Sequence, residues 1–298
     1  MQNKGIFYLV ISVLVTGSTG FVGSFLTSTF KSDYNLRCYS LQSQSIEELN
    51  LSGIEVVLHL AGIAHQLKAV DQKIYYAVNY ELTRQLANKA KQKGVGHFIF
   101  FSTVKVYGEY TEDREVWSEE SECRPLSHYG KSKKMAEDVL LALADESFAV
   151  SIVRCPLIYG RFVKGNLKAL VSLIRKLPFI VFPNMTPKRG MIHLDNLAAM
   201  LRVIIEKSIG GVFLAYDGTD FSTSELLKII ATECGKKIVL FHCPEIFLAL
   251  FGLVFREYFQ RLFKPVKLDN ILTVKKLGYL PVITPRKGIK DILEPENR

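Results

Sequence analysis

The stretch SVLVTGSTGFVGSFLTSTF, residues 12–30, constrains the fold more than any other part of the sequence. It opens with a β-branched run, turns through Gly17, Gly20 and Gly23, and continues with the apolar spacing of a helix. A strand that passes through glycines directly into a helix is typical of a parallel sheet covered by helices. Such glycines let the backbone approach a diphosphate, which the free N–H groups of the helix start stabilise. The spacing also suits plain strand-to-helix packing, but the strand before it and the helix after it favour a dinucleotide site.

The first half of the chain repeats this alternation of strands and helices. Further strands are predicted at residues 35–41, 55–62, 97–103 and 149–155, and further helices at 80–94 and 129–144. After Gly160 the pattern loosens into mixed elements separated by prolines. The 298 residues therefore predict an α/β fold, with a doubly wound parallel Rossmann sheet over residues 1–161 and a smaller substrate-capping domain over residues 162–298. Some late elements are expected to return to the first domain.

One gap in the alternation affects the cofactor. Only about fourteen residues separate the strand at 35–41 from the strand at 55–62, too few for a helix, a strand and another helix. The third strand, an edge strand in this topology, is therefore predicted to be missing or shortened, close to where adenine binds. The sequence RCYSLQSQS after the second strand offers no Asp or Glu to the ribose 2′-hydroxyl, which disfavours strict use of NAD. Arg37 and Ser40 are predicted to meet a 2′-phosphate, so NADP is favoured over NAD, although strand alternation could equally turn Arg37 away.

A pair of residues suited to acid–base chemistry lies in HYGKSKKMAED. Tyr129 and Lys133 are four residues apart at the start of a helix and share one face. A lysine ammonium beside a phenol favours phenolate and lowers a pKa that is ordinarily near 10. Such pairs also occur by chance on solvated helix surfaces. Thr103, which ends the predicted strand at 97–103, supplies a third group, a hydroxyl, to orient a substrate oxygen, so we predict that these three residues are catalytic.

These residues, with several further motifs, resemble the extended short-chain dehydrogenases, and within them the UDP-glucose 4-epimerase-like enzymes of nucleotide sugars. The resemblance covers nearly the whole chain and rests on TGSTGFVG, HLAG, AVNYELT, FSTVKVYG, the Tyr129–Lys133 pair, RCPLIYG, KGN, KRGMIHLDNLA and KKLGYLP. It implies that Lys133 also holds the nicotinamide ribose. It further implies contacts to the cofactor from Gly17, Thr19, Gly20, Phe21, Val22, Gly23, Leu60, Ala61, Gly62, Asn79 and Tyr129.

The same resemblance implies that Asn166 and Arg189 contact the nucleotide diphosphate of a UDP-sugar. Each has a simpler interpretation, Asn166 as a turn former or helix cap and Arg189 as a solvated loop charge. A homodimer is also expected.

The stretch FIFFSTVKVYGEY bears on the reaction. The related 4,6-dehydratases read S-T-D-E-V-Y-G here and use the acidic pair to eliminate water, whereas this chain has Val104 and Lys105. We therefore expect oxidation or reduction of one carbinol or carbonyl. Lys105 also resembles the SVKV run of a subgroup from O-antigen gene clusters that reduces a UDP-4-keto-6-deoxy-N-acetylhexosamine at C4. Lys105 is predicted to bind substrate; the alternative is a solvent-facing charge.

Two reactions remain open from the sequence, reduction of a 4-keto sugar and epimerisation of UDP-glucose or UDP-N-acetylglucosamine at C4. Reduction is favoured, because an epimerase must keep its reduced cofactor bound while the keto sugar rotates in the site. The missing strand predicts weaker binding of the cofactor. A non-catalytic dinucleotide sensor is a third possibility. Such a sensor is expected to have lost the catalytic residues that this chain keeps.

The remaining features narrow the partners and the location. The net charge of +9 comes without a nucleic-acid motif or a dense basic run, so phosphate-bearing small molecules are the expected anions. Five scattered cysteines indicate neither a zinc site nor a disulfide framework, and a reducing cytoplasm is the simplest location. The histidines His59, His65, His128 and His193 are treated as non-catalytic, and no metal is expected. The apolar segment 245–263 is too short to cross a bilayer, so it either packs within the substrate domain or lies at the inner face of the membrane.

Overall fold

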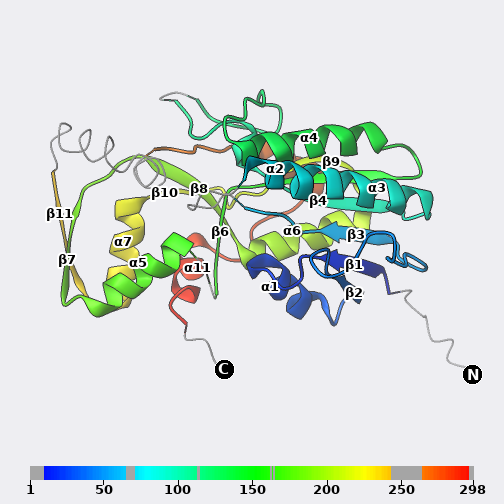
Figure 1. Cartoon of the computed structure of the whole chain (residues 1–298). Helices are drawn as coiled ribbons and strands as arrows, with labels where there is room; N and C mark the ends of the chain where they lie inside the picture. The colour runs from blue at the N-terminus through cyan, green and yellow to red at the C-terminus, as the bar shows by residue number, and fades with distance from the viewer. Residues whose placement is uncertain are drawn as a thin grey trace, which may run out of the picture.

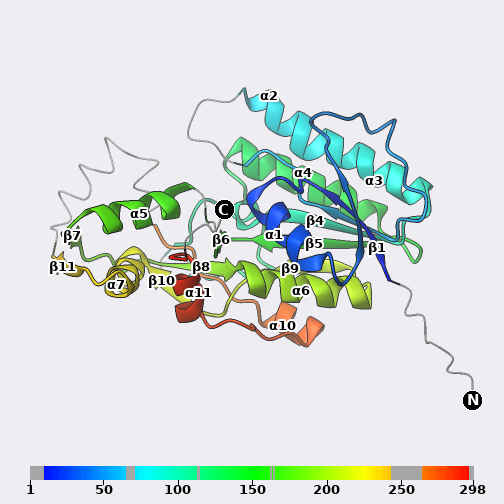
Figure 2. The same ribbon diagram turned by 90° about the horizontal axis from the view of Figure 1, so that it is seen from below.

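The computed structural model describes residues 10–64, 71–112, 115–161, 163, 165–242 and 264–294. The molecule has a larger lobe, built on one broad sheet, and a smaller lobe beside it (Figures 1 and 2). The apolar segment 245–263 lies outside the described residues, so neither prediction for it is tested. Within the described ranges, no helix combines the length and apolar character needed to cross a bilayer.

A six-stranded parallel sheet forms the centre of the larger lobe, in the order β2-β1-β3-β4-β5-β9. Its strands are β1 (Ser12–Thr16), β2 (Asn35–Tyr39), β3 (Val56–His59), β4 (His97–Thr103), β5 (Ala149–Cys155) and β9 (Gly211–Leu214). Every residue of β3 and β4 is buried, as expected for parallel strands covered on both faces. The prediction of a doubly wound α/β fold is confirmed.

Helices cover both faces of this sheet (Figure 1). On one face lie α1 (Phe21–Phe30) and α6 (Leu194–Lys207), and on the other α3 (Leu82–Gln92) and α4 (His128–Leu143). The short helix α2 (Gln72–Tyr75) continues through a π-helical turn, η1 (Tyr76–Glu81), into α3. The apolar stripes of these helices form two buried clusters, one on each side of the strands.

Among the described residues, no strand pairs with the outer edge of β2. Residues 40–55, all described, form turns and no strand, and the partner of β2 in this part of the chain is β1. At the opposite edge, β9 comes from the second half of the chain and pairs with β5. Together with α6 it completes the larger lobe, so the chain crosses between the lobes more than once. The domain boundary at residue 161 stays a prediction.

The smaller lobe contains a three-stranded sheet of order β10-β8-β6 and a two-stranded sheet of β11 and β7. Its elements are β6 (Leu157–Tyr159), α5 (Gly165–Lys176), β7 (Phe179–Pro183), β8 (Lys188–His193), β10 (Asp220–Ser222), α7 (Thr223–Glu233), β11 (Lys237–Phe241) and α11 (Pro285–Asp291). The start of α7 is fixed by a capping box between Ser222 and Glu225. The remaining helix, α10 (Ile271–Leu277), packs against β9 and α6 of the larger lobe.

A strap of residues 264–270 ties the two lobes together. Backbone hydrogen bonds join Trp117 N to Lys267 O at 3.0 Å and Asp269 N to Trp117 O at 2.9 Å. On the other side of the strap, Gly190 N donates to Val266 O at 2.8 Å. The strap therefore connects the loop that follows β4 with strand β8 of the smaller lobe.

Candidate active site

The glycine turn between β1 and α1 is shaped by close contacts within the backbone. Gly17 has a positive φ of 74°, and a Cβ there would lie 2.6 Å from the backbone nitrogen of Ala61. A Cβ on Gly23 would lie 2.1 Å from the carbonyl oxygen of Gly17. Gly20 differs, because its φ of −71° suits any residue and its Cβ would meet only Gly17 O, at 3.3 Å. Gly17 and Gly23 are therefore needed for the turn itself, whereas Gly20 leaves space beside it.

A cavity of about 380 Å³ opens beside this turn, bounded by the loops that follow β2 and β3. The residues that line it are Gly17, Ser18, Thr19, Gly20, Tyr39, Ser40, Leu41, Gln42, His59, Leu60, Ala61, Gly62, Ile63, Val78 and Leu82. Gly20 caps α1 without a side-chain hydrogen bond, so the N–H groups of the first helical turn are left to an anion. An open turn at a helix start next to an apolar cavity fits a dinucleotide.

The cavity contains seven of the predicted cofactor residues, namely Gly17, Thr19, Gly20, Ser40, Leu60, Ala61 and Gly62. Sequence reasoning missed eight others that line it, Ser18, Tyr39, Leu41, Gln42, His59, Ile63, Val78 and Leu82. Most of these adjoin the carboxyl end of a predicted strand, and that position was the signal that could have found them. Among the described residues that line the cavity there is no aspartate or glutamate, as the sequence after the second strand indicated.

Seven of the predicted cofactor residues lie outside the lining of the cavity, and four of these are on α1 and β2. Phe21, Val22 and Gly23 form the first turn of α1. Arg37 lies on the edge strand β2, where its guanidinium donates to the carbonyl of Asn50 at 3.0 Å. Its Nη1 is therefore directed toward the turns that follow β2, and the structure does not bring Arg37 to the cavity.

Asn79 also lies outside the lining, but it holds the loop after β3 in place. Its side chain is fully buried and projects from the π-helical turn η1. Its Oδ1 accepts from Ile63 N at 2.8 Å, and its Nδ2 donates to Ile63 O at 3.0 Å and to Ser132 Oγ at 3.1 Å. Asn79 thus connects this loop to helix α4, and π-helical turns are frequent at functional sites.

The predicted catalytic residues meet at the carboxyl end of β4. Thr103 is the last residue of that strand, and its side chain lies near enough to the Tyr129 phenol, close to the start of α4, to lower the pKa of that phenol. One turn further along α4, Lys133 is buried, and its Nζ donates to Phe101 O at 2.8 Å. A Cβ on Gly62 would lie 3.1 Å from this Nζ, so Lys133 reaches the lining of the cavity.

The pKa values of Tyr129 and Lys133 differ from those expected from the sequence. Burial raises the pKa of Tyr129 to about 12, and the nearby Thr103 side chain opposes this only in part. Burial lowers the pKa of Lys133 to about 8, against the opposing effects of Cys155 and Glu137. The expectation that Lys133 lowers the pKa of the phenol is wrong here, since its ammonium faces the Phe101 carbonyl and the Phe100 ring, 4.4 Å from the ring centroid. At neutral pH Tyr129 carries its proton and is therefore poised as an acid.

Lys105 follows Thr103 in a short 3-10 turn, η2 (Val104–Val106). Its backbone nitrogen donates to Thr103 Oγ1 at 3.2 Å, and its ammonium forms an ion pair with Glu109. The Lys105 side chain is 25% exposed, so it is not simply a solvent-facing charge. Its role toward a substrate stays a prediction.

The two residues predicted to contact a diphosphate lie in the smaller lobe. Arg189, on β8, donates from Nη1 to the carbonyl oxygen of Lys264 in the strap, at 2.8 Å. Asn166 falls in the first turn of α5, and its side chain is outside the described part of the chain. No described contact joins either residue to Thr103, Tyr129 or Lys133, so their roles stay predictions.

His59 lines the cavity, but its hydrogen bonds to neighbouring elements indicate a structural role. Its Nδ1 is 2.6 Å from Thr16 Oγ1 and its Nε2 is 2.9 Å from Thr83 Oγ1. Burial lowers its pKa to about 3, so the ring is neutral across the physiological range. It joins β1, β3 and α3, in line with its treatment as non-catalytic.

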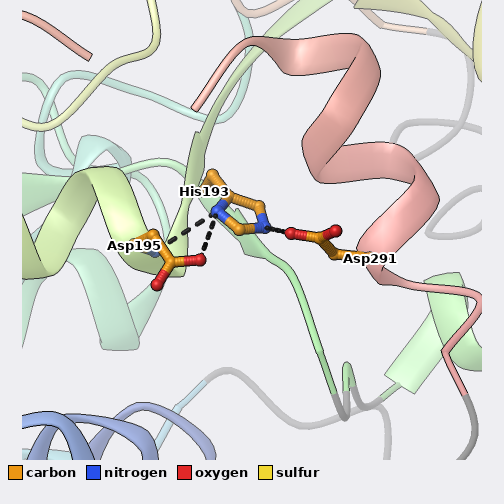
Figure 3. A group of neighbouring side chains, drawn as sticks. All are labelled: His193, Asp195 and Asp291. Carbon is orange, nitrogen blue, oxygen red and sulfur yellow. Dashed lines mark hydrogen bonds and ion pairs between the residues drawn. The ribbon is translucent and has the colours of Figure 1, made fainter. Parts of the chain in front are cut away.

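A second buried histidine lies where α6 and α11 meet. His193 caps α6 by accepting from Asp195 N at 3.2 Å. Figure 3 shows its ring between two carboxylates, with Nδ1 3.5 Å from Asp195 Oδ2 and Nε2 3.6 Å from Asp291 Oδ2. Because each carboxylate faces a different ring nitrogen, we interpret the group as a junction between the two helices rather than as a metal site.

Known proteins resemble this chain in sequence and in fold. The model of the NAD dependent epimerase/dehydratase family matches residues 13–214. The chain is 33% identical to UDP-glucose 4-epimerase of Vibrio cholerae, over 96% of this chain and 97% of that protein. Among solved structures, RMD from Pseudomonas aeruginosa complexed with NADPH matches with a TM-score of 0.77 at 20% identity, over 95% of this chain and 96% of that one. UDP-glucuronic acid 4-epimerase from Bacillus cereus in complex with NAD matches with a TM-score of 0.72 at 21% identity, over 95% and 97%.

Substitution of Gly20 tests the cofactor turn without straining it. Gly20→Val keeps an ordinary backbone conformation, so the protein should fold, but its side chain fills the space beside the start of α1. We expect the affinity for NAD and NADP to fall at least about tenfold, measured by calorimetry. Gly53→Ala, at a glycine of positive φ with open space around it, is the control for the cost of altering a glycine. Unchanged affinity in a folded Gly20→Val protein would count against the assignment.

The lowered pKa of Lys133 predicts how cofactor binding depends on pH. A buried lysine of pKa about 8 keeps its ammonium below that pH and loses it above. If the ammonium holds the dinucleotide, affinity should be constant from pH 6 to 7 and weaken by roughly tenfold once Lys133 is neutral. Fluorescence titration across pH 6–10 measures this. The Lys133→Met protein should show no such midpoint, and a midpoint retained in that variant would assign it to another group.

Proposed function

Because the chain belongs to the NAD-dependent epimerase/dehydratase family, we propose that it is an NAD(P)-dependent oxidoreductase that acts at C4 of a UDP-hexose or UDP-N-acetylhexosamine. The favoured reaction is reduction of a UDP-4-keto-6-deoxy sugar, as in the synthesis of polysaccharide or O-antigen precursors. The observation that carries the class of reaction is the meeting of Thr103, Tyr129 and Lys133 beside the cofactor cavity.

The residues of this chain account for the proton side of the reaction. The nicotinamide of a bound cofactor supplies the hydride that reaches C4. Tyr129 donates its proton to the C4 oxygen, and Thr103 hydrogen-bonds that oxygen as negative charge develops on it. Lys133, whose Nζ reaches the lining of the cavity, holds the nicotinamide ribose. Val104 and Lys105 provide no carboxyl groups in place of the acidic pair of the dehydratases, so the proposed chemistry stops at the carbinol.

The open edge at β2 favours reduction over epimerisation. An epimerase returns the hydride to the same sugar and therefore gains from a cofactor that stays bound, whereas a reductase must exchange its oxidised cofactor at each turnover. The proposed adenine side of the cavity is bounded by Tyr39, Ser40, Leu41 and Gln42, and within the described ranges no further strand covers the edge beside them. This arrangement supports an exchangeable cofactor.

Epimerisation at C4 is the second candidate, and a specific observation supports it. The relative from Vibrio cholerae, similar over almost its whole length, is named a UDP-glucose 4-epimerase. Epimerisation would use Thr103, Tyr129 and Lys133 in both directions, so the proposed catalytic residues are the same.

We also propose that NADP is used in preference to NAD. Fewer residues support this preference in the structure than in the sequence. Arg37 is engaged with the Asn50 carbonyl, so it no longer contributes to the argument. What remains is Ser40 in the lining of the cavity, together with the lack of a lining carboxylate among the described residues.

One experiment separates the two reactions. Purified protein is given UDP-4-keto-6-deoxy-N-acetylglucosamine with NADPH or NADH and, separately, UDP-glucose or UDP-N-acetylglucosamine without added reductant. A reductase should consume one reduced cofactor per product in the first reaction and show no inversion at C4 in the second. The Tyr129→Phe protein should lose at least about 100-fold in turnover while keeping its cofactor affinity. Inversion without reductant, with cofactor that survives gel filtration, would replace the reductase by the epimerase.

Substitution of Lys105 tests its predicted contact with the substrate. Lys105→Ala should raise the Michaelis constant for the UDP-sugar by about tenfold and leave that for the cofactor nearly unchanged. Glu109→Gln removes the partner of the ion pair and keeps the lysine, so it separates loss of the pair from loss of the cation. Equal effects of both variants on both constants would make Lys105 a structural residue.

A further inference from the structure

Glu137 is a carboxylate buried beneath the proposed catalytic residues. It lies on α4, four residues after Lys133 and eight after Tyr129, so all three project from one side of the helix. Its side chain is completely buried. Removal of a carboxylate from water costs several kcal/mol, so a charge at this place needs partners that are closely arranged.

Those partners come from the two central strands. Arg154 on β5 donates to the carboxylate from Nη2 at 2.7 Å and from Nε at 3.2 Å. Ser102 on β4 donates its hydroxyl proton to Oε1 of the same group. Ser102 and Arg154 are paired in the register of the sheet, and Ser102 directly precedes Thr103. One carboxylate therefore joins α4 to β4 and β5, one residue away from the hydroxyl that meets Tyr129.

The network continues beyond Arg154 into the segment that follows β4. The Nη1 atom of Arg154 donates to the Tyr107 hydroxyl at 2.9 Å and to the Glu119 carbonyl at 3.2 Å. Glu119 in turn accepts from the backbone nitrogen of Thr273 in α10, at 2.8 Å. The ion pair thus fixes the strand, the helix and the following loop relative to one another.

We propose that Glu137 is a positioning residue, which holds α4 at the depth where Tyr129 meets Thr103 and Lys133 reaches the cofactor cavity. This inference rests on the proposed function, because Glu137 acts through those three residues. It explains why a charged pair is kept in an apolar interior, where a hydrophobic pair of similar volume would stabilise the fold at least as well.

The charges around Lys133 supply a readout that a purely structural role would not change. The titratable groups that face Lys133 or Glu137 are Cys155 and Arg154 on β5, His59 on β3, and Tyr107 and Cys123 from the segment after β4. The carboxylate of Glu137 favours the ammonium of Lys133 and so raises its pKa against the effect of burial. Without the carboxylate, Lys133 should lose its proton at lower pH.

The test compares Glu137→Gln with Asp138→Asn, the same change of charge at the next residue of α4. Asp138 forms an ion pair with Lys134 on the solvent side, where its side chain is 58% exposed. Glu137→Gln should lower kcat by about tenfold or more, since a small shift in a catalytic group is that costly. The pH midpoint of cofactor binding should move about one unit below that of the wild type. Asp138→Asn should leave kcat, cofactor affinity and this midpoint unchanged.

Folding and the proposed function are controlled separately. Folding of Glu137→Gln is checked by its thermal unfolding transition, and its cofactor affinity at pH 6, where Lys133 keeps its charge, should fall together with kcat because α4 carries Lys133 as well as Tyr129. If that variant does not fold, Ser102→Ala removes one contact and keeps the ion pair; it should lower kcat without moving the midpoint.

Wild-type kcat together with an unchanged pH midpoint of cofactor binding in Glu137→Gln would overturn the role of Glu137. If Ser102→Ala has to be used instead, wild-type kcat in that variant would overturn it. Turnover retained in Tyr129→Phe would instead overturn the proposed function, and the midpoint of binding would still test Glu137.

Discussion

The six strands of the large sheet all run in the same direction, and this parallel pairing determines where chemistry can occur. Because their carboxyl ends meet at one edge, the loops after β1, β2 and β3 form the walls of the cavity. Thr103 ends β4 at the same edge, and α4 returns Tyr129 to it. The cofactor turn and the acid–base group therefore lie close together, although more than a hundred residues separate Gly17 from Tyr129.

Strand and helix positions could be read from the sequence because the local signals were strong and agreed with one another. β-branched runs, the glycine turn and the capping box each have a direct physical cause, and the helix at 129–144 begins within one residue of its expected start. The proximity of Thr103 to Tyr129 also followed, since a strand end and the start of a crossover helix share one edge of a parallel sheet.

Other features depend on contacts between distant parts of the chain and could not be predicted locally. The direction of the Lys133 ammonium depends on the carbonyl of Phe101 across the interface between helix and strand, so its expected effect on the phenol was wrong. Arg37 was predicted to contact the cofactor from its position on a strand. Its guanidinium instead donates to the carbonyl of Asn50, in the turns after that strand. The Lys105–Glu109 ion pair, by contrast, joins residues only four apart, so it could have been predicted from the local spacing of charges.

The crossing of the chain between the lobes has a consequence for synthesis on the ribosome. The sixth strand, β9, pairs Val153 with Phe213, and α6 covers the same face of the sheet as α1. When the first 161 residues have emerged, one edge of β5 still lacks its partner β9. The apolar face of the sheet that α1 covers still lacks α6. The larger lobe therefore cannot close until residue 214 is available, by which time much of the smaller lobe has also been made. The two lobes are expected to acquire their native structure together, and an arrested nascent chain that ends between them should expose hydrophobic surface to chaperones.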